Sequence, residues 1–386
     1  MVTSEERHEA RYQRRRRARL SRRAAVAAQA DDHEKVFSYE NLYAAYKKCR
    51  RNVSWKASVQ KYITEAPLMV YETWERLQKG TYKSPPFFEF DVFERGKKRH
   101  IRSTTIHERV VQAALCENAL IPMLCRSFIY DNGACRKKKG YDHALRRMVC
   151  CVERHIREHG TTGAILLADA SKFFDSIPHR VVDELMDKTF HDERIVTLTK
   201  RMVHQFDEAA EPGCGIGLGL GSPISQTFAP AALDRLDHHI KDALGIKGYV
   251  RYMDDFFVLG EDKDVLRALV SDIRAQMGHV GMKLNERKTG VVPLRDTFTW
   301  LKVRVDITET GGKSLRIARS SVTRQRRRLK KLAAKVRCGA MSAARIENSM
   351  QSWWAHAKRF RSRRTRGSMA ALYQDLFGVP WKGGNG

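Results

Sequence analysis

Hydrophobic positions recur with two different periods along the chain, and the two periods predict different elements. Between residues 38 and 85, apolar side chains such as Leu42 and Ala45 return every three or four positions, which predicts helices that bury one face. A further helix is expected over residues 105–126. The run Ala164–Ala168 is short and continuously apolar, which is typical of a strand covered on both faces. The pattern therefore predicts a helical region followed by a mixed region with a buried sheet.

Aromatic and glycine-rich segments define the rest of the mixed region. Residues 249–259 are mostly apolar and aromatic and are broken by one Asp-Asp pair, so we expect two strands that meet at this acidic pair. Five glycines and two prolines among residues 211–223 predict a long loop. Closer to the N-terminus, residues 87–93 are expected to form a strand and residues 94–99 a turn.

Positive charge is concentrated near the two ends of the chain. The 72 Lys and Arg exceed the 44 Asp and Glu, which gives a net charge of +28. Residues 1–23 contain nine Arg and three Glu, and residues 313–366 contain eighteen Lys or Arg and a single acid. This distribution favours a polyanionic partner, and we expect nucleic acid. Residues 324–337 and 343–364 are expected to form two basic helices, and residues 1–37 a basic arm.

Two classes of protein are not expected from the composition. No apolar run approaches the roughly 18 residues of a membrane-spanning helix, so we expect no membrane partner. The small apolar stretch Ala24–Ala30 is too short for a secretory signal. The eight cysteines form no Cys-x-x-Cys pair and no zinc-ligand spacing, which favours reduced thiols and a cytoplasmic location.

Three aspartates carry the candidate chemistry. Asp169 ends the apolar run that begins at Ala164, and Asp254 and Asp255 interrupt the later aromatic segment. Each of them, taken alone, is compatible with an ordinary cap or turn residue. Together, carboxylates at neighbouring strand ends would repel one another unless cations compensate them, and hard oxygen ligands favour Mg²⁺ or Mn²⁺. Two such ions about 4 Å apart support in-line phosphoryl displacement, the chemistry of nucleotide addition.

Several segments, in the same order along the chain, resemble the motifs of reverse transcriptases. The sequence Tyr-Met-Asp-Asp at residues 252–255 resembles their YxDD box, and residues 167–177 resemble their first catalytic motif. Residues 220–226 stand at the position of the glycine-containing motif between the two. Residues 300–302 stand where the primer-contacting turn of the family usually carries Leu-Gly. Further matches lie at residues 98–115, 133–140 and 284–289, so that the resemblance spans about residues 40–365.

The resemblance implies an α+β fold of the right-hand polymerase type, with fingers, a palm built on an antiparallel sheet and a helical basic thumb. It implies an RNA-directed DNA polymerase that adds deoxynucleotides to a primer 3′-OH by a two-metal mechanism. The expected partners are an RNA template, a DNA or RNA primer and dNTPs. The implied lobes are a basic arm at 1–37, fingers at 38–160 with part of 180–220, a palm at 161–310, a thumb at 311–378 and a tail at 379–386.

Four residues are expected to hold the metals if the resemblance is carried over. The carboxylates of Asp169, Asp254 and Asp255, assisted by the backbone carbonyl of Ala170, would bind two Mg²⁺ ions, for which Mn²⁺ can substitute. The three aspartates would therefore be both the catalytic residues and the metal ligands.

Three more residues are expected to bind the incoming nucleotide. Arg136 would bind the triphosphate, since its fork of donors suits phosphate oxygens. Phe174 would lie under the sugar and exclude a ribose 2′-OH, so that the product is DNA. Lys288 would lie near the leaving pyrophosphate. The alternative interpretations are a surface arginine in a Lys-rich loop, a core phenylalanine and a solvated lysine.

The glycine-containing motif bears on which reverse transcriptase the chain resembles. Leu220, Gly221 and Gln226 would lie beside the incoming nucleotide, and their pattern is similar to that of diversity-generating retroelement enzymes from bacteria or phages. Leu220 in place of a polar residue would loosen base selection and favour error-prone copying. A reverse transcriptase of an antiphage-defence, retron-like or unclassified system is the alternative. A template-independent DNA polymerase and a catalytically silent RNA-binding protein also remain open.

The basic C-terminal region would track the template–primer duplex. Within it, Arg326, Arg327, Lys330 and Lys331 are expected to contact phosphates, and Trp353 and Trp354 to pack between helices. The Arg14–Arg17 cluster is expected to bind structured RNA or an accessory RNA-binding protein. One departure from the family concerns Pro230, which would delete a helical hydrogen bond unless it lies in the first turn.

Overall fold

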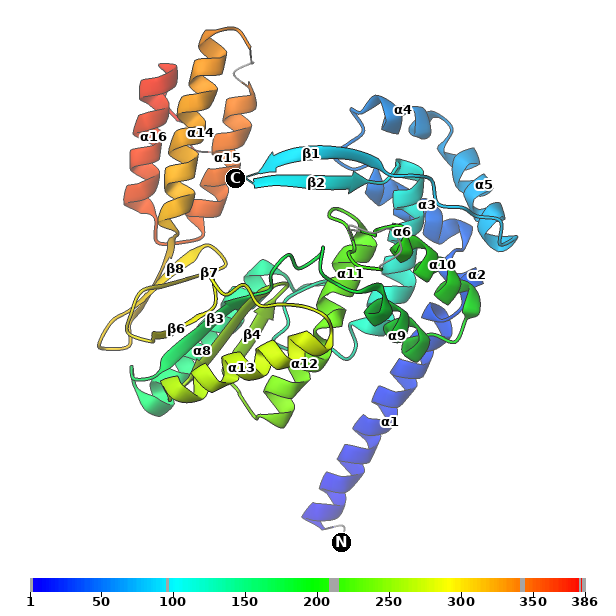
Figure 1. Ribbon diagram of the computed structural model, residues 1–386, viewed down its shortest axis with the longest axis horizontal. Coiled ribbons are helices and arrows are strands. Elements are labelled where there is room, and N and C mark those ends of the chain that lie inside the picture. Colours follow the sequence, from blue (N-terminus) through cyan, green and yellow to red (C-terminus); the bar gives the residue numbers. More distant parts are fainter. Residues whose placement is uncertain (1–2, 95–96, 208–214, 341–343, 382, 384–386) are drawn as a thin grey trace.

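The computed structural model describes residues 3–94, 97–207, 215–340, 344–381 and 383. A small antiparallel sheet lies at the centre, a group of helices with one β-hairpin lies on one side of it, and a bundle of three helices lies on the other (Figure 1). A single long helix, α1 (Ser4–Ala30), projects from the body at the end far from the bundle. This mixture of helices and antiparallel sheets confirms the predicted α+β class.

The N-terminal helices belong to the same extensive apolar cluster as α13 and one face of the central sheet. The expected helix over residues 105–126 is present, but its middle turn is π-helical. The expected strand at residues 87–93 is half of a hairpin, and its partner begins at Lys97, so the predicted turn is shorter than residues 94–99. The elements are α2 (His33–Val36), α3 (Tyr39–Cys49), α4 (Ala57–Thr64), α5 (Ala66–Gln78), β1 (Phe88–Glu94), β2 (Lys97–Ser103), α6 (Ile106–Leu115), the π-helical turn (Cys116–Leu120) and α7 (Ile121–Leu124).

The central sheet has the strand order β4-β5-β3-β6, and all its neighbouring strands are antiparallel. Alternate residues of β3 face opposite sides, as a strand requires. Ile165 packs in the cluster that contains α8, and Leu166 packs in the cluster that contains α13. A helix therefore covers each face of the sheet, as the continuous apolar run predicted. The bounds are α8 (Tyr141–His159), β3 (Ala164–Asp169), β4 (Tyr249–Tyr252), β5 (Asp255–Gly260), α13 (Lys263–His279) and β6 (Gly290–Pro293).

Between β3 and β4 the chain leaves the sheet and returns to it through short helices. The part of the glycine-rich loop at residues 208–214 lies outside the described residues, and the loop ends at Pro223, the first residue of α11. The helices of this excursion are α9 (His179–Thr189), α10 (Glu193–His204), α11 (Pro223–Ala232), α12 (Asp234–His238) and a π-helical turn (His239–Ala243).

A three-stranded sheet connects the central sheet to the C-terminal bundle. The sequence predicted two basic helices, whereas the structure has three, because the second ends at Lys358 and a third begins at Arg363. The bundle has its own apolar core, in which Trp353 packs between helices as expected. The elements are β7 (Phe298–Trp300), β8 (Val303–Ile307), β9 (Lys313–Ile317), α14 (Arg319–Arg337), α15 (Ala344–Lys358) and α16 (Arg363–Phe377).

A search of the helices within the described ranges found none with the length and apolar character needed to cross a membrane.

Candidate active site

Strand register brings the three predicted aspartates together. β3 and β5 run antiparallel, and their last pair is Asp169 with Asp255. Directly paired residues on antiparallel strands have Cβ atoms about 4.5–5.5 Å apart. Asp254 precedes β5 on the turn that joins it to β4, and its backbone carbonyl accepts a hydrogen bond from the Ala170 N–H (3.1 Å). Segments 85 positions apart in the sequence are thus joined at one edge of the sheet.

The turn that carries Asp254 has an uncommon backbone conformation. Met253 has φ = 54°, in the left-handed region that a non-glycine residue seldom adopts. Its carbonyl accepts a hydrogen bond from Nη1 of Arg251 (3.0 Å). The hydrogen bond between Asp254 and Ala170 holds the other side of the turn. Two hydrogen bonds from outside the turn therefore maintain a strained conformation beside the candidate catalytic residues.

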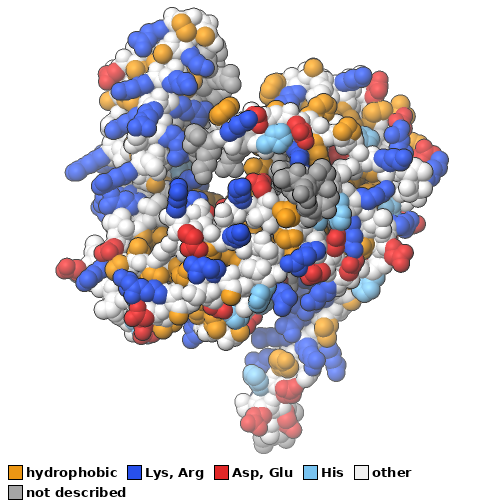
Figure 2. All heavy atoms as spheres, in the orientation of Figure 1, with side chains coloured by type: hydrophobic (Ala, Val, Ile, Leu, Met, Phe, Trp, Pro, Cys, Tyr) orange, Lys and Arg blue, Asp and Glu red, His pale blue; other side chains and the backbone are white. Residues whose placement is uncertain are grey.

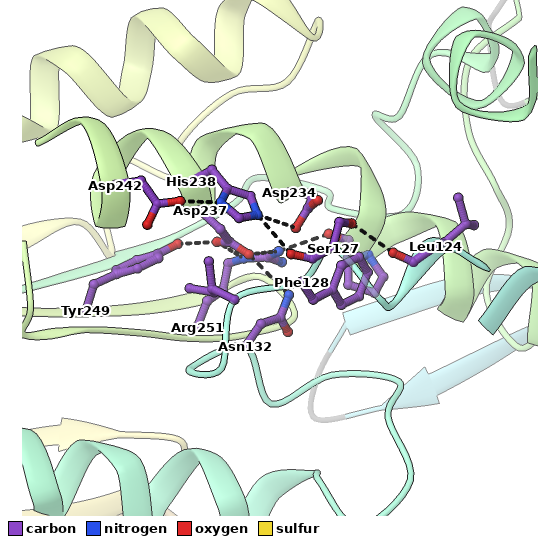
Figure 3. A network of polar contacts seen from close by, with 12 residues as sticks. Leu124, Ser127, Phe128, Asn132, Asp234, Asp237, His238, Asp242, Tyr249 and Arg251 are labelled. Carbon is purple, nitrogen blue, oxygen red and sulfur yellow. Dashed lines mark hydrogen bonds and ion pairs between the residues drawn. The ribbon is translucent and has the colours of Figure 1, made fainter. Parts of the chain in front are cut away.

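Arg251 belongs to a buried polar network beneath this turn (Figure 3). Arg251 and Asp237 are both 0% exposed, and Nε and Nη2 of the arginine donate to the two carboxylate oxygens of Asp237, each at 2.6 Å. Tyr249 and Asn132 also donate to Asp237. Burial opposes the charge on Arg251, but the charge and hydrogen bonds of Asp237 outweigh burial and raise the pKa of Arg251 above its usual value. This ion pair was not foreseen, because nothing in the sequence pairs an arginine inside an apolar strand with one particular acid.

The charges that act on Asp255, one of the three candidate catalytic carboxylates, come from exposed lysines and from its acidic neighbours. Burial, together with the negative charges of Asp254 and Asp169, raises the pKa of Asp255 to about 7, while Lys288 and Lys302 act against the shift. Nζ of Lys288 lies 2.6 Å from Oδ2 of Asp169. The side chain of Lys288 is 57% exposed, so solvent weakens this ion pair. The lysines that act on these carboxylates, Lys288 and Lys302, are both exposed, so solvent screens their charge.

The sequence motif around Lys288 contributes a second contact. Asn285 donates from Nδ2 to Oδ1 of Asp169 (3.1 Å), and its backbone N–H donates to the carbonyl of Asp169 (2.7 Å). Asn285 was part of a matched motif but was given no role from the sequence. Asp169 is thus oriented by two side chains that lie more than 110 positions further along the chain.

An open cavity of about 640 Å³ lies over the aspartates. Its walls come from the ends of β3 and β5, from the turn between β7 and β8, and from the first residues of α14. The cavity is large enough for a small ligand. It is lined by polar and charged side chains that include Asp169, Asp254, Asp255, Lys288, Lys302 and Ser320.

The donor set fits hard cations by its chemistry. The three aspartates offer only carboxylate oxygens, the ligands that Mg²⁺ and Mn²⁺ prefer, and their charges repel one another as they stand. Within the described ranges, no three acidic, histidine or cysteine side chains are already arranged closely enough to hold one metal ion. Asp169 also carries the ion pair with Lys288, so a cation at this carboxylate would compete with the ammonium. Next to Ala170, the Asp169 carbonyl accepts a hydrogen bond from the backbone of Asn285, and the Ser171 N–H donates to the carbonyl of Lys283. The Ala170 carbonyl takes no part in these backbone hydrogen bonds.

Arg136 lies in a different arrangement from the one the sequence predicted. Its guanidinium donates to the backbone carbonyls of Phe128, Ile129 and Asn132 and braces the loop before α8. A triphosphate contact would require these hydrogen bonds to break. Lys137, next to Arg136, has an exposed side chain and keeps this loop positively charged.

Pro230 deletes a helical hydrogen bond, as the sequence predicted. It lies seven residues after the start of α11 and leaves the carbonyl of Gln226 without its usual N–H donor. The Cys135 thiol donates to this carbonyl instead, with Sγ 2.6 Å from the oxygen. The backbone of Gln226 is therefore tied to the loop of Arg136, while the Gln226 side chain is exposed.

The remaining predicted nucleotide-binding residues lie at the start of the excursion and of α11. Phe174 is half-buried and packs edge-on against Phe173, with ring centroids 5.3 Å apart. Leu220 is half-buried. Gly221 is exposed and has φ = 100°, a conformation that other residues rarely adopt. None of these three is among the residues that line the cavity over the aspartates.

The turn between β7 and β8 replaces the expected glycine with strained residues. Leu301 and Lys302 have φ of 47° and 63°, which is the pattern of hairpin turns that usually contain Asn or Gly. The hydroxyl of Tyr141 donates to the Leu301 carbonyl (3.0 Å), and the Ala318 N–H donates to the Lys302 carbonyl (3.1 Å). These contacts anchor the turn at the rim of the cavity.

The predicted phosphate-binding residues lie on the exposed side of α14, above the cavity. Lysine and arginine side chains cover much of the bundle surface in Figure 2. Arg326 also donates to the Ser368 hydroxyl of α16 (2.8 Å). The exposed residues of this set are Arg326, Arg327, Lys330 and Lys331.

Comparisons with known proteins place this arrangement in a family. Residues 73–305, more than half of the chain, match the family described as reverse transcriptase (RNA-dependent DNA polymerase). No curated protein matches the chain significantly in sequence. Solved structures similar to it include telomerase from Candida albicans in complex with a fragment of telomeric RNA and apo telomerase from Candida tropicalis truncated from its C-terminal domain.

The likeness to these telomerases is distant. The chain is 11% identical to each of them. For the first, the TM-score is 0.49, and the match covers 81% of this chain and 65% of that one. For the second, the TM-score is 0.45, and the match covers 59% and 54%. On the match over residues 73–305, the chain belongs to the reverse transcriptase family.

Proposed function

We propose that the chain is an RNA-directed DNA polymerase that extends a primer on an RNA template. The observation that carries this proposal is the pairing of Asp169 with Asp255, with Asp254 on the adjoining turn, at the floor of an open cavity. In the reaction, the primer 3′-oxygen loses its proton and bonds to the α-phosphorus of a dNTP. The bond to the β,γ-pyrophosphate breaks, and pyrophosphate leaves.

Asp169, Asp254 and Asp255, with the carbonyl of Ala170, would hold two Mg²⁺ ions, for which Mn²⁺ can substitute. The ions, when bound, would stabilise the attacking and leaving oxygens of the displacement. Burial and the negative charges of Asp254 and Asp169, which together raise the pKa of Asp255, support cation binding at this place. The hydrogen bonds from Arg251 and Ala170 keep the strained turn in position, so that little reorganisation is needed when substrate arrives.

Lys288 and Phe174 have proposed roles toward the nucleotide. Lys288 holds its ammonium against Asp169 and would move to the leaving pyrophosphate once cations replace it there. Phe174 would lie under the sugar and exclude a 2′-OH. Arg136 would reach the triphosphate only after releasing the three carbonyls that it now braces.

The proposed lobes are those of the implied polymerase division, with fingers at 38–160, a palm at 161–310 and a thumb at 311–378. The thumb would bind the template–primer backbone through its exposed lysines and arginines. Charge reversal of Arg326, Arg327 and Lys330 to Glu should weaken duplex binding without sequence preference and flatten its salt dependence by about 0.9 per lost phosphate contact. Unchanged affinity and slope in this triple variant would contradict the assignment.

A retroelement role with error-prone copying is the finer proposal. It rests on Leu220, Gly221 and Gln226 in the motif beside the nucleotide, where Leu220 removes a polar group. Such a system would supply the template RNA, and an accessory RNA-binding protein would assist. A cytoplasmic location in a bacterial or phage-infected cell belongs to the same proposal.

Primer extension tests the proposed function. The full chain is incubated with a defined RNA template, an annealed DNA primer, dNTPs and Mg²⁺, and the product is sequenced. We expect complementary DNA from the wild type, none from Asp254→Asn, and normal amounts from Asp264→Asn, which changes an exposed carboxylate on α13.

The product also separates the alternatives. Undiminished synthesis by Asp254→Asn would overturn the assignment of the site. Product unrelated to the template would indicate a template-independent polymerase. Errors concentrated at one template base would support the retroelement role, and faithful copies would support another reverse transcriptase system.

A further inference from the structure

The α1 helix carries an unusual density of positive charge. Residues 11–23 contain eight arginines and no acid, and all eight side chains are exposed. Among the described residues, none of these guanidinium groups forms an ion pair with a carboxylate. No lysine occurs before Lys35, so the basic character of the arm comes from arginine alone. Guanidinium groups bind phosphate oxygens through two parallel hydrogen bonds, which lysine cannot do.

This charge makes the helix costly in isolation. Arg11, Arg15, Arg19 and Arg23 follow one another at four-residue spacing, and like charges at this spacing destabilise a helix. The helix has no continuous apolar face to offset the cost, since its large apolar side chains Tyr12, Leu20 and Val26 are exposed. A bound polyanion would remove the repulsion.

The base of the helix is firmly attached to the body. The carboxylate of Asp31 accepts hydrogen bonds from the backbone N–H groups of His191 and Asp192, at 2.9–3.0 Å. In return, the carboxylate of Asp192 accepts one from the N–H of His33 (2.7 Å). These reciprocal contacts fix the point at which α1 leaves the protein. The direction of the helix is therefore set by the fold.

A basic groove lies where α1 meets the end of α7. Its cavity of about 470 Å³ is lined by arginines on both sides, and Ala18, Val26 and Pro122 form the apolar part of the lining. Figure 2 shows basic side chains gathered along the part of α1 nearest the body. The arginines of the groove are Arg15, Arg19, Arg22 and Arg23 from α1 and Arg126 from the segment after α7.

We propose that this groove binds the sugar–phosphate backbone of double-stranded RNA. Single-stranded nucleic acid is usually bound with aromatic platforms, and α1 contains no Phe or Trp and only one Tyr, Tyr12. Duplex RNA is recognised mainly through its shape and phosphates, for which arginines suffice. A membrane surface would require an apolar face that α1 lacks. The occupant is therefore a base-paired stem.

The stem would lie away from the cavity over the three aspartates. α1 projects from the end of the molecule far from the α14–α16 bundle, and the sheet with the three aspartates lies between them (Figure 1). The choice of RNA over other polyanions rests on the proposed function, because a polymerase that copies RNA meets stems in its template. The groove would hold such a stem while the single-stranded part of the template RNA enters the cavity over the aspartates.

Binding of a labelled RNA stem-loop of about 16 base pairs to the full chain tests the proposal. In one variant, Arg15, Arg19, Arg22 and Arg23 are changed to Gln. In the matched control, Arg7, Arg11, Arg14 and Arg17, which do not line the groove, are changed to Gln, so that α1 loses the same charge. Arg14 and Arg17 belong to the cluster that the sequence predicted to bind structured RNA, so the control also compares that cluster with the groove. We expect at least a tenfold loss of affinity in the groove variant and at most a threefold loss in the control. Single-stranded RNA and duplex DNA of the same length should bind more weakly than the stem to the wild type.

Extension of an oligonucleotide primer on an unstructured RNA is measured in parallel and should be equal in both variants and the wild type. This readout separates the two proposals, since failed extension with normal stem binding would overturn only the polymerase function. Equal losses of affinity in the two variants, or none in the groove variant, would overturn the groove. Equal affinity of the wild type for stem, single strand and duplex DNA would overturn the choice of duplex RNA.

Discussion

Two acidic clusters lie near the turn that joins β4 to β5, and the protein treats them in opposite ways. Asp237 is fully buried and forms a bidentate ion pair with Arg251. Asp169, Asp254 and Asp255 lie at the floor of an open cavity, and burial together with their mutual repulsion raises the pKa of Asp255 to about 7. The first cluster has a fully buried positive partner, whereas the lysines that face the second cluster, Lys288 and Lys302, are exposed to solvent.

The contrast teaches how charge compensation separates a structural site from a functional one. A buried carboxylate with a dedicated arginine is neutralised at all times, so it can only hold the structure together. Neighbouring carboxylates whose negative charge is only weakly neutralised by side chains attract cations. We call such a cluster under-compensated. The two clusters are also coupled, because Arg251 neutralises Asp237 and donates to the turn that presents Asp254.

The largest expected effect is a loss of polymerase activity that leaves the stability of the fold unchanged. Asp255→Asn should reduce primer extension by about a thousandfold or more, equivalent to about 4 kcal/mol of lost transition-state stabilisation. The free energy of unfolding should stay the same or rise, because a repulsive charge is removed. Steady-state extension and urea unfolding measure the two quantities. A variant that keeps its activity but loses stability would reverse the proposed contrast.

The reverse pattern is expected for the paired cluster. Arg251→Met leaves Asp237 buried without its partner and should lower the free energy of unfolding by about 3–5 kcal/mol. Urea unfolding followed by tryptophan fluorescence measures the loss.

The double variant Arg251→Met/Asp237→Leu is the control for this prediction. It removes both charges and should recover much of the stability, because no unpaired ion remains. If Arg251→Met unfolds at the wild-type urea concentration, the ion pair is not the structural element proposed here.

Added cations should affect only the under-compensated cluster. Mg²⁺ at ten times its dissociation constant should stabilise the wild type by about 1.4 kcal/mol, seen as a rise in melting temperature. Chelation of the metal should reverse the rise. Asp255→Asn should show little of this shift, and Asp264→Asn should show all of it. A full shift in Asp255→Asn would place the cation elsewhere.

The smallest expected effect concerns Lys288. Because its ammonium is largely exposed, Lys288→Met should change the free energy of unfolding by less than about 1 kcal/mol. Extension should fall by about tenfold if the ammonium assists the leaving pyrophosphate, since proton transfer or charge stabilisation by one group contributes about that much or more. Lys288→Arg, which keeps the charge, should recover part of the rate. Equal rates for the three proteins would make Lys288 a solvated lysine.

Local patterns in the sequence predicted the parts of the structure that neighbouring residues determine. The apolar run before Asp169 predicted a strand covered on both faces, and the aromatic segment around Asp254 predicted two strands and a turn. Pro230 predicted the loss of a helical hydrogen bond. These predictions succeeded because periodicity, turn chemistry and the imino acid act over a few positions.

Other features depended on which distant segments meet. Asn132 reaches Asp237 across 105 positions, and Arg136 turns its guanidinium to carbonyls of its own loop in place of the cavity. The thiol of Cys135 replaces the donor that Pro230 lacks, a contact across 91 positions. The break between α15 and α16 also has no clear sequence signal, since the basic pattern continues through it.

By itself, the sequence determined the order of the reverse transcriptase motifs, the identity of the three aspartates and the placement of positive charge at both ends. Only the tertiary structure decided that Asp169 pairs with Asp255, that Asp237 is neutralised by Arg251, and that the arginines of α1 form a groove with Arg126. The physical reason is that a charge has no structural or functional meaning until its neighbours in space are known. Those neighbours are set by strand register and helix packing over distances in sequence that no local pattern records.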